Sequence, residues 1–217
     1  GAFGKQAVNA GMSFDAAMSQ VAATMGYSVA ELNQEGSEAF NTFNTLRQFA
    51  QDMGSATAFS ASEAAEALNY MALAGYDAET SMQMLPNVLN LAAAGGISLG
   101  NASDMVTDAQ SALGLTLEGT STMVDQMAAA SSKSNTSVAQ LGEAFLTIGA
   151  TARNLSGGTQ ELSTVLGVLA DNGIKGAEGG THLRNMILSL QSPTKDGAEL
   201  LKKMGVATYD ADGNMRS

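Results

Sequence analysis

The sequence predicts an all-α protein made of many short helices, and three observations indicate this fold class. Apolar residues recur at intervals of three and four along most of the 217 residues, which is the spacing of one face of a helix. Two of these stretches follow a Ser-x-x-Glu or Ser-x-x-Gln motif, which is typical of a helix start. Glycines follow several of them, where helices commonly end.

Residues 1–59 predict two N-terminal helices. The first ends near Gly26 and the second ends at Met53, where Gly54 is expected to stop it. Their apolar faces consist of Phe14, Ala17, Met18, Val21 and Met25 in the first helix and of Phe40, Phe43, Leu46, Phe49 and Met53 in the second. The second helix carries most of the aromatic bulk and is expected to anchor this part of the core.

Residues 60–136 predict a first helical unit. Ser60 and Glu63 have the spacing of a capping box, and Gly75 ends the helix that they open. Asp77 is expected to cap the next helix, which the glycines at 95 and 96 end. Pro86 lies inside that helix and predicts a kink or a break, because proline lacks an N–H and clashes with the preceding turn. Further helices are expected at about 101–113 and 120–131.

Residues 137–205 predict a second helical unit. Ser137 and Gln140 form another capping box, a break follows at 156–158, and Gly173 ends the next helix. A tight turn is then expected, and it contains Gly176, Gly179 and Gly180. The following helix carries Leu183 and Ile187 and closes at Pro193, and a short last helix covers residues 196–204.

The tail, residues 206–217, has a different pattern. Extended residues flank the pair Asp212-Gly213, which favours the tight turn of a β-hairpin. We expect a small, truncated C-terminal hairpin here.

The sequence also predicts an internal duplication. A shift of 77 residues superposes residues 60–113 on residues 137–190 without a gap: Ser60 falls on Ser137, and Gly96 falls on Gly173. We therefore expect two equivalent three-helix units. Pro86 departs from this pattern because it falls on Ser163. The alternative is that any two alanine-rich helices ended by glycine look alike.

Composition excludes several classes of function. Residues 1–132 hold thirteen acidic and two basic side chains, and residues 133–217 hold eight of each. A net charge of −11 repels phosphate backbones and anionic lipid, so neither nucleic acid nor membrane is expected as a partner. Without cysteine, disulfides and thiolate metal sites are excluded. No apolar run spans a membrane and no signal peptide is visible. Both ends look cut, so we expect a piece of a longer protein.

The side chains that carry chemistry are few, and we expect no catalytic, cofactor-binding or metal-binding residue. His182 is the only histidine, and a lone histidine near a helix start is usually structural or solvated. The glycines at 173–180, with Lys175 and Arg184 nearby, leave an anion site open. The favoured interpretation is a turn in which Thr181 caps a helix, because the pattern matches neither a Walker loop nor a dinucleotide fingerprint.

Two further patterns have plain explanations. Asp210 and Asp212 are weakly similar to a calcium loop, but a hairpin tip is favoured because the glycine is misplaced. The pairs Glu63/Glu66 and Asp104/Asp108 are expected on a solvated helix face. The thirteen methionines fall mostly on apolar faces, so core filling is favoured over an adaptable binding surface.

Several ordered stretches resemble the core region of phage tail tape measure proteins of siphovirus-type phages and prophages. They are residues 64–75, 85–95, 102–104, 112–115, 135–144, 166–176, 180–184, 190–193 and the end of the chain from Leu201. The resemblance covers nearly the whole chain and is weakest before about residue 35.

The resemblance implies a structural segment that acts in tail assembly and in tail-length determination inside the tail tube. Its implied partners are the tail tube protein, tail assembly chaperones and tail-tip proteins, and self-association stays open. The implied location is the virion tail, and the host cytoplasm during assembly. No catalytic residues or cofactors are implied. The alternatives are a helical adaptor that binds partner helices in a methionine-lined groove, and an enzyme that uses carboxylates alone.

Overall fold

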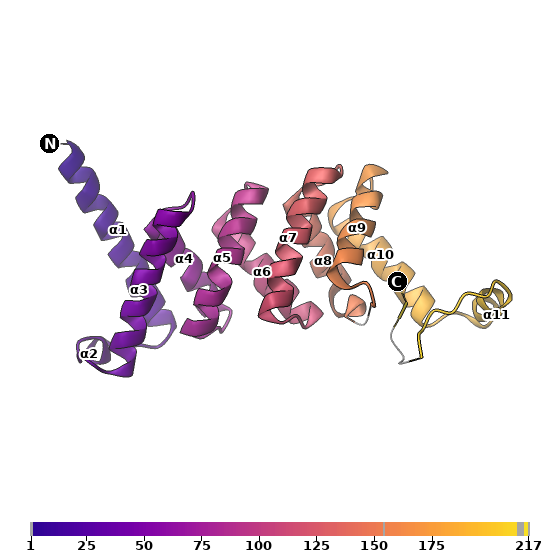
Figure 1. The fold of residues 1–217 in the computed structure, drawn as a ribbon, viewed down its shortest axis with the longest axis horizontal. Helices are drawn as coiled ribbons and strands as arrows, with labels where there is room; N and C mark the ends of the chain where they lie inside the picture. The colour runs from indigo at the N-terminus through magenta and orange to yellow at the C-terminus, as the bar shows by residue number, and fades with distance from the viewer. Residues whose placement is uncertain (1, 154, 212–214, 217) are drawn as a thin grey trace. The chain divides into compact units, whose positions relative to one another are not determined.

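The computed structural model describes residues 2–153, 155–211 and 215–216, with side chains from residue 8 onward. Figure 1 shows helices joined by short connections. The helices are α1 (Ala2–Thr24), α2 (Val29–Leu32), α3 (Glu38–Ala56), α4 (Ala61–Leu73), α5 (Ala78–Gly95), α6 (Leu99–Leu113), α7 (Leu117–Lys133), α8 (Val138–Ile148), the 3-10 helix η1 (Gly149–Ala152), α9 (Gly158–Asp171), α10 (Gly176–Gln191) and α11 (Lys195–Lys203). In the described part of the chain, regular structure outside these helices is limited to two isolated β-bridges. The all-α prediction is confirmed.

The chain divides into two compact units, residues 1–107 and residues 108–217, and the boundary falls within α6. We call them unit 1 and unit 2. The predicted division into residues 1–59, 60–136, 137–205 and 206–217 follows the proposed repeat and stays a prediction.

In unit 1, α4 packs against α1, α3 and α5. The buried face of α4 is rich in alanine, and its buried residues are Ala64, Ala65, Ala67, Leu68 and Met71. Larger side chains from the neighbouring helices complete the core, among them Met18, Leu46, Met84 and Leu85. Because an alanine methyl extends little from the backbone, this face lets the surrounding helices approach α4 closely.

Gly54 does not end α3, so that prediction is wrong. The helix continues to Ala56. A Cβ atom at position 54 would lie 2.7 Å from the Cα atom of Ala61, at the start of α4. The glycine therefore allows the end of α3 to approach the start of α4, which a periodicity argument does not reveal.

In unit 2, α8 packs against α7, α9 and α10. Phe145 is 1% exposed at the centre of this packing. Around it lie the buried side chains Met123, Met127, Leu141, Leu162, Leu166, Leu183 and Ile187. The aromatic ring supplies bulk that the alanines and glycines of this unit lack.

Local helix signals account for most helix ends. Capping boxes at Ser60 and Ser137 are confirmed, with both the side-chain and the backbone hydrogen bond present. Gly75, Gly96 and Gly173 have positive φ angles just after helices, as predicted. The sequence analysis missed a third capping box at Ser28, which opens the four-residue helix α2. It also missed the Thr116 cap, so α7 begins three residues before its expected start.

The predicted break at Pro86 is wrong, because α5 runs unbroken from Ala78 to Gly95. Proline removes one backbone donor from the interior of a helix. Pro86 is flanked by Met84, Leu85, Val88 and Leu89, all of which are buried. The burial of this apolar face holds the segment helical through the proline.

The helix bounds agree with the register of the predicted repeat. The starts of α4 and α8, Ala61 and Val138, lie 77 residues apart, and so do the starts of α6 and α10, Leu99 and Gly176. The internal duplication itself concerns the arrangement of the helices and stays a prediction.

The tail carries two single bridges. Met215 pairs with Tyr209 in antiparallel fashion and with Leu155 in parallel fashion. The Asp212-Gly213 turn lies outside the described residues, and the hairpin stays a prediction. Of the described helices, none has the length and apolar character needed to cross a membrane.

Loss of a capping box should destabilise the unit that contains it. We expect Ser137→Ala to lower the free energy of unfolding of unit 2 by about 1 kcal/mol, because the N–H of Gln140 loses its acceptor. Urea unfolding followed by circular dichroism measures this. Ser189→Ala is the control, since that exposed hydroxyl only bonds a carbonyl of its own helix. Equal effects of the two substitutions would show that the cap contributes nothing.

Candidate functional site

The residues that the sequence analysis weighed for chemistry do not converge. His182 is 56% exposed on α10, and its Nε2 atom lies 3.7 Å from Glu178 Oε1 on the same helix. This agrees with a solvated histidine. Glu63, Glu66, Asp104 and Asp108 are all exposed, as a solvated acidic face requires. Among the described residues, no group of three or more His, Cys, Asp or Glu side chains is arranged to hold a metal ion.

The glycine cluster is not a turn, and Thr181 is not a helix cap. Both predictions are wrong, because α10 begins at Gly176 and includes Gly179 and Gly180. The hydroxyl of Thr181 instead donates to the carbonyl of Ala177 inside the helix. The glycines belong to a helix–helix contact, and the geometry at Gly180 shows why they are needed.

Gly180 allows α10 to lie against α8. A Cβ atom at this position would lie 2.6 Å from the carbonyl oxygen of Ala144 and 2.8 Å from its Cα atom. At Gly176, where φ is +57°, a Cβ atom would also lie 2.8 Å from Glu143 Oε2. Small residues on one helix face let two helix backbones approach closely. The cluster therefore serves packing, and the geometry does not favour the anion site.

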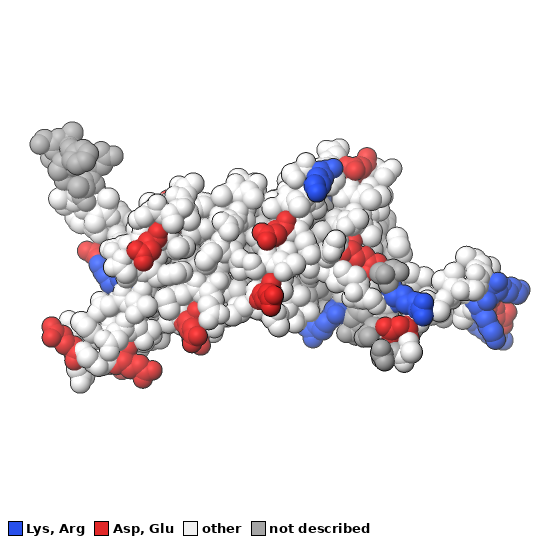
Figure 2. All heavy atoms as spheres, viewed as in Figure 1, with Lys and Arg blue, Asp and Glu red and all other residues white. Residues whose placement is uncertain are grey.

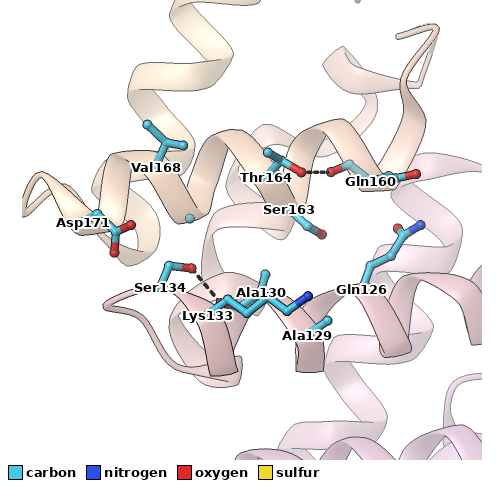
Figure 3. Close-up of a pocket in the computed structure, with 11 residues that line it drawn as sticks. Gln126, Ala129, Ala130, Lys133, Ser134, Gln160, Ser163, Thr164, Val168 and Asp171 are labelled. Atoms are coloured by element: carbon cyan, nitrogen blue, oxygen red, sulfur yellow. Dashed lines mark hydrogen bonds between the residues drawn. The ribbon is translucent and has the colours of Figure 1, made fainter.

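A polar cavity of about 340 Å³ lies between α7 and α9 in unit 2. Figure 3 shows its lining side chains on the two facing helices, with Ser163 directed toward the space between them. The lining residues with polar side chains are Gln126, Lys133, Ser134, Gln160, Ser163, Thr164 and Asp171. The sequence analysis did not find this cavity, because its residues come from two separate helices and match no motif.

Part of this cavity's polar lining is already engaged. The carboxylate of Asp171 accepts the backbone N–H of Asn135 at 2.7 Å, and the hydroxyl of Ser134 donates to the carbonyl of Ala130 at 2.6 Å. The hydroxyl of Ser163, which is 3% exposed, and Oε1 of Gln126 are buried without a hydrogen-bond partner among the described residues. Activating a serine requires a neighbouring base. Asp171, the carboxylate of this lining, is held by a backbone amide, so the cavity suits polar contacts and not nucleophilic chemistry.

A second, apolar cavity of about 240 Å³ lies between α9, α10 and the tail. Its apolar lining includes Leu162, Val165, Leu183, Ile187, Val206 and Met215. The methionine-lined groove of the adaptor hypothesis would need methionines gathered at such a surface. Seven methionines are instead buried in the core: Met18, Met71, Met84, Met105, Met123, Met127 and Met215. Core filling, the favoured prediction, describes the majority of them.

Unit 1 carries one cluster of charge and aromatic rings. Arg47 on α3 forms an ion pair with Asp15 on α1 at 2.6 Å. Its guanidinium carbon lies 5.0 Å from the centre of the Phe14 ring and 5.9 Å from that of Phe43. Both partners of the ion pair are substantially exposed, so the pair contributes little on its own. The cluster joins α1 to α3 and offers no reactive group.

The pKa shifts in unit 1 arise at helix starts and at one tyrosine. Hydrogen bonds from the side chain and backbone of Ser28 lower the pKa of Glu31. The backbone N–H and the side chain of Thr80 lower the pKa of Asp77. Burial raises the pKa of Tyr27, with smaller contributions from Glu38 and Asp77. The two carboxylates are helix-capping groups, so their shifts follow from helix capping and not from a catalytic cleft.

Comparison with known proteins identifies the family. Residues 47–217 match the family described as phage-related minor tail proteins. The chain belongs to this family. The match begins within α3 and includes both capping boxes at Ser60 and Ser137, the α8–α10 contact and both cavities of unit 2. Its start also agrees with the weak resemblance before about residue 35. As a minor tail protein, the chain is a phage tail component.

The relatives of this minor tail protein are tape measure proteins by name. It is 32% identical over 213 residues to the tape measure protein of Pneumococcus phage Dp-1, and these residues cover 98% of this chain and 18% of that relative. It is 29% identical over 171 residues to the "Probable tape measure protein" of Escherichia phage P2, covering 79% of this chain and 21% of that relative. The predicted resemblance to tape measure proteins is confirmed. No solved structure matches the chain.

Proposed function

We propose that this chain is a structural segment of a tape measure protein, which acts in phage tail assembly and sets tail length from inside the tail tube. The observation that carries the proposal is the similarity to two named tape measure proteins along 98% and 79% of the chain. The partners in this role are the tail tube protein, tail assembly chaperones and tail-tip proteins. Assembly takes place in the host cytoplasm, and the segment has no catalytic role.

The helical structure supports a length-determining role in physical terms. A helix rises about 1.5 Å per residue, so a helical chain converts its residue number into length in a fixed ratio. Alanine-rich and glycine-rich contacts such as that between Gly180 and Ala144 bury little apolar surface, which lowers the free energy needed to separate the helices. A chain of this kind opens into an extended row of helices more readily than one with a bulky core.

The proposal is tested by changing the number of residues in the full-length protein of an infectious phage. Duplicating residues 108–217, which are unit 2, should lengthen the tail by roughly 160 Å if the added segment is extended as helix. Deleting the same residues should shorten the tail by the same amount. Electron microscopy of purified virions measures both changes.

The matched control is Gly11→Ala in the same phage. A side chain at this position meets no atom within 4 Å, so tail length should stay as in the parent. Tails of parental length in the duplication variant would contradict the length-determining role, because that variant adds residues and removes no contact.

A further inference from the structure

The short helix α11 has an apolar face that no residue of the described structure buries. Gly197, Leu200, Leu201 and Met204 lie at intervals of three and four, which places them on one face. Leu200 is 57% exposed and Met204 is 63% exposed, and α11 has no buried residue. The charged residues Lys195, Asp196, Glu199, Lys202 and Lys203 occupy the remaining faces, and Figure 2 shows charged side chains grouped at this end of unit 2.

The position of α11 in the chain corresponds to that of α7. The buried residues of α7 are Thr120, Met123, Val124 and Met127. Counting on by the repeat period of 77 residues leads from these four to Gly197, Leu200, Leu201 and Met204. The face that α11 exposes is therefore the face that α7 buries.

The two helices also begin in the same way. The hydroxyl oxygen of Thr116 accepts the N–H of Gly119 at 3.0 Å, and that of Thr194 accepts the N–H of Gly197 at 3.2 Å. An acidic residue lies between threonine and glycine in both helices, Glu118 in α7 and Asp196 in α11. The caps are one residue further apart than the repeat period, so α11 begins one residue later than α7.

The partners of α7 indicate what covers α11. Packing against α8 and α9, the helices that follow it in sequence, buries the apolar face of α7. We propose that α11 opens a third helical unit and that helices following residue 217 in the full-length protein cover its apolar face. The chain spans only 18% and 21% of its two relatives, so a full-length chain of similar size supplies such helices.

The size of the face favours the same chain over a second copy. A stable interface between separate molecules needs roughly 800 Å² from each partner, which a nine-residue helix does not offer. A segment joined covalently to α11 is present at a high effective concentration and needs far less contact area. This inference rests on the membership of the minor tail protein family and not on the length-determining role.

Thiol labelling of the full-length protein tests the proposal. This chain has no cysteine, so single cysteines report local exposure. Leu200→Cys places a thiol on the apolar face, and Glu199→Cys places one on the opposite, charged face as the matched control. In the full-length protein, maleimide should modify position 200 about tenfold or more slowly than position 199, as read by peptide mass spectrometry. In the 217-residue chain the two positions should react at similar rates.

Met204→Cys gives an independent reading from the same face and should follow position 200. Equal labelling of positions 199, 200 and 204 in the full-length protein would overturn the proposal. So would protection of position 200 in the 217-residue chain that rises with concentration and accompanies dimers in sedimentation, since it would assign the face to a second copy. Neither result depends on tail length, so this inference can fail while the proposed function stands.

Discussion

Replacing Gly180 with alanine should destabilise unit 2 by about 2 kcal/mol, although alanine is the better helix former. Alanine in the middle of a helix gains about 1 kcal/mol over glycine from propensity alone. Here the added methyl would lie 2.6 Å from the carbonyl oxygen of Ala144 and 2.9 Å from Cβ of Thr147. The first of these atoms is backbone and cannot rotate away, so α8 and α10 must separate, and overpacking of this kind costs about 1–3 kcal/mol or more.

Hydrogen exchange of peptides from α8 and α10 measures the effect in unit 2 directly, and urea unfolding measures it in the whole chain. Gly11→Ala is the matched control, because it makes the same chemical change within a helix where the methyl meets open space. It should stabilise its helix slightly. A Gly180→Ala variant as stable as the parent would show that the α8–α10 contact tolerates separation.

Phe145→Ala should destabilise unit 2 by about 3–5 kcal/mol, the range for removing a large buried aromatic ring. Phe145 is 1% exposed, and α7, α9 and α10 all pack against its helix. The surrounding backbones are already close together, so they collapse little into the space that the ring leaves. The free energy of unfolding from urea titration is the measurement.

Leu146→Ala controls for the loss of apolar atoms at the neighbouring position. Leu146 is 40% exposed, so its truncation should change stability by less than about 1 kcal/mol. If the two substitutions had similar effects, Phe145 would not be the centre of the unit 2 core.

The parts of the fold that could be predicted from sequence are those that depend on neighbouring residues. Ser60 and Ser137 cap helices through hydrogen bonds that span three residues, and the positive φ angles of Gly75 and Gly173 follow from the absence of a side chain. Such interactions can be recognised from the local sequence, and both capping boxes are confirmed.

The errors at Gly54, Gly180 and Pro86 have one physical origin. A glycine favours a turn and a close helix contact equally, and only the position of the facing helix decides between them. Ala61 faces Gly54 and Ala144 faces Gly180, but neither pairing follows from local sequence. At Pro86, the apolar burial of α5 offsets the loss of one backbone hydrogen bond.

The polar cavity was beyond sequence analysis for a related reason. Ser163 and Gln126 come from different helices, and a buried serine and an exposed one have the same letter. The repeat gives a partial signal after the fact, because Ser163 aligns with Pro86, which has no hydroxyl. The cavity's buried hydroxyl is therefore absent from the aligned position in the first unit.

The contact between Gly180 and Ala144 has a mechanical consequence. Dispersion attraction between atoms falls steeply once they move apart by an ångström, and here the touching atoms are backbone and short side chains. Long side chains can stretch and stay engaged while helices slide, but these cannot. The pair should resist small displacements and then yield abruptly, so a pull along the chain would release whole helices in discrete steps.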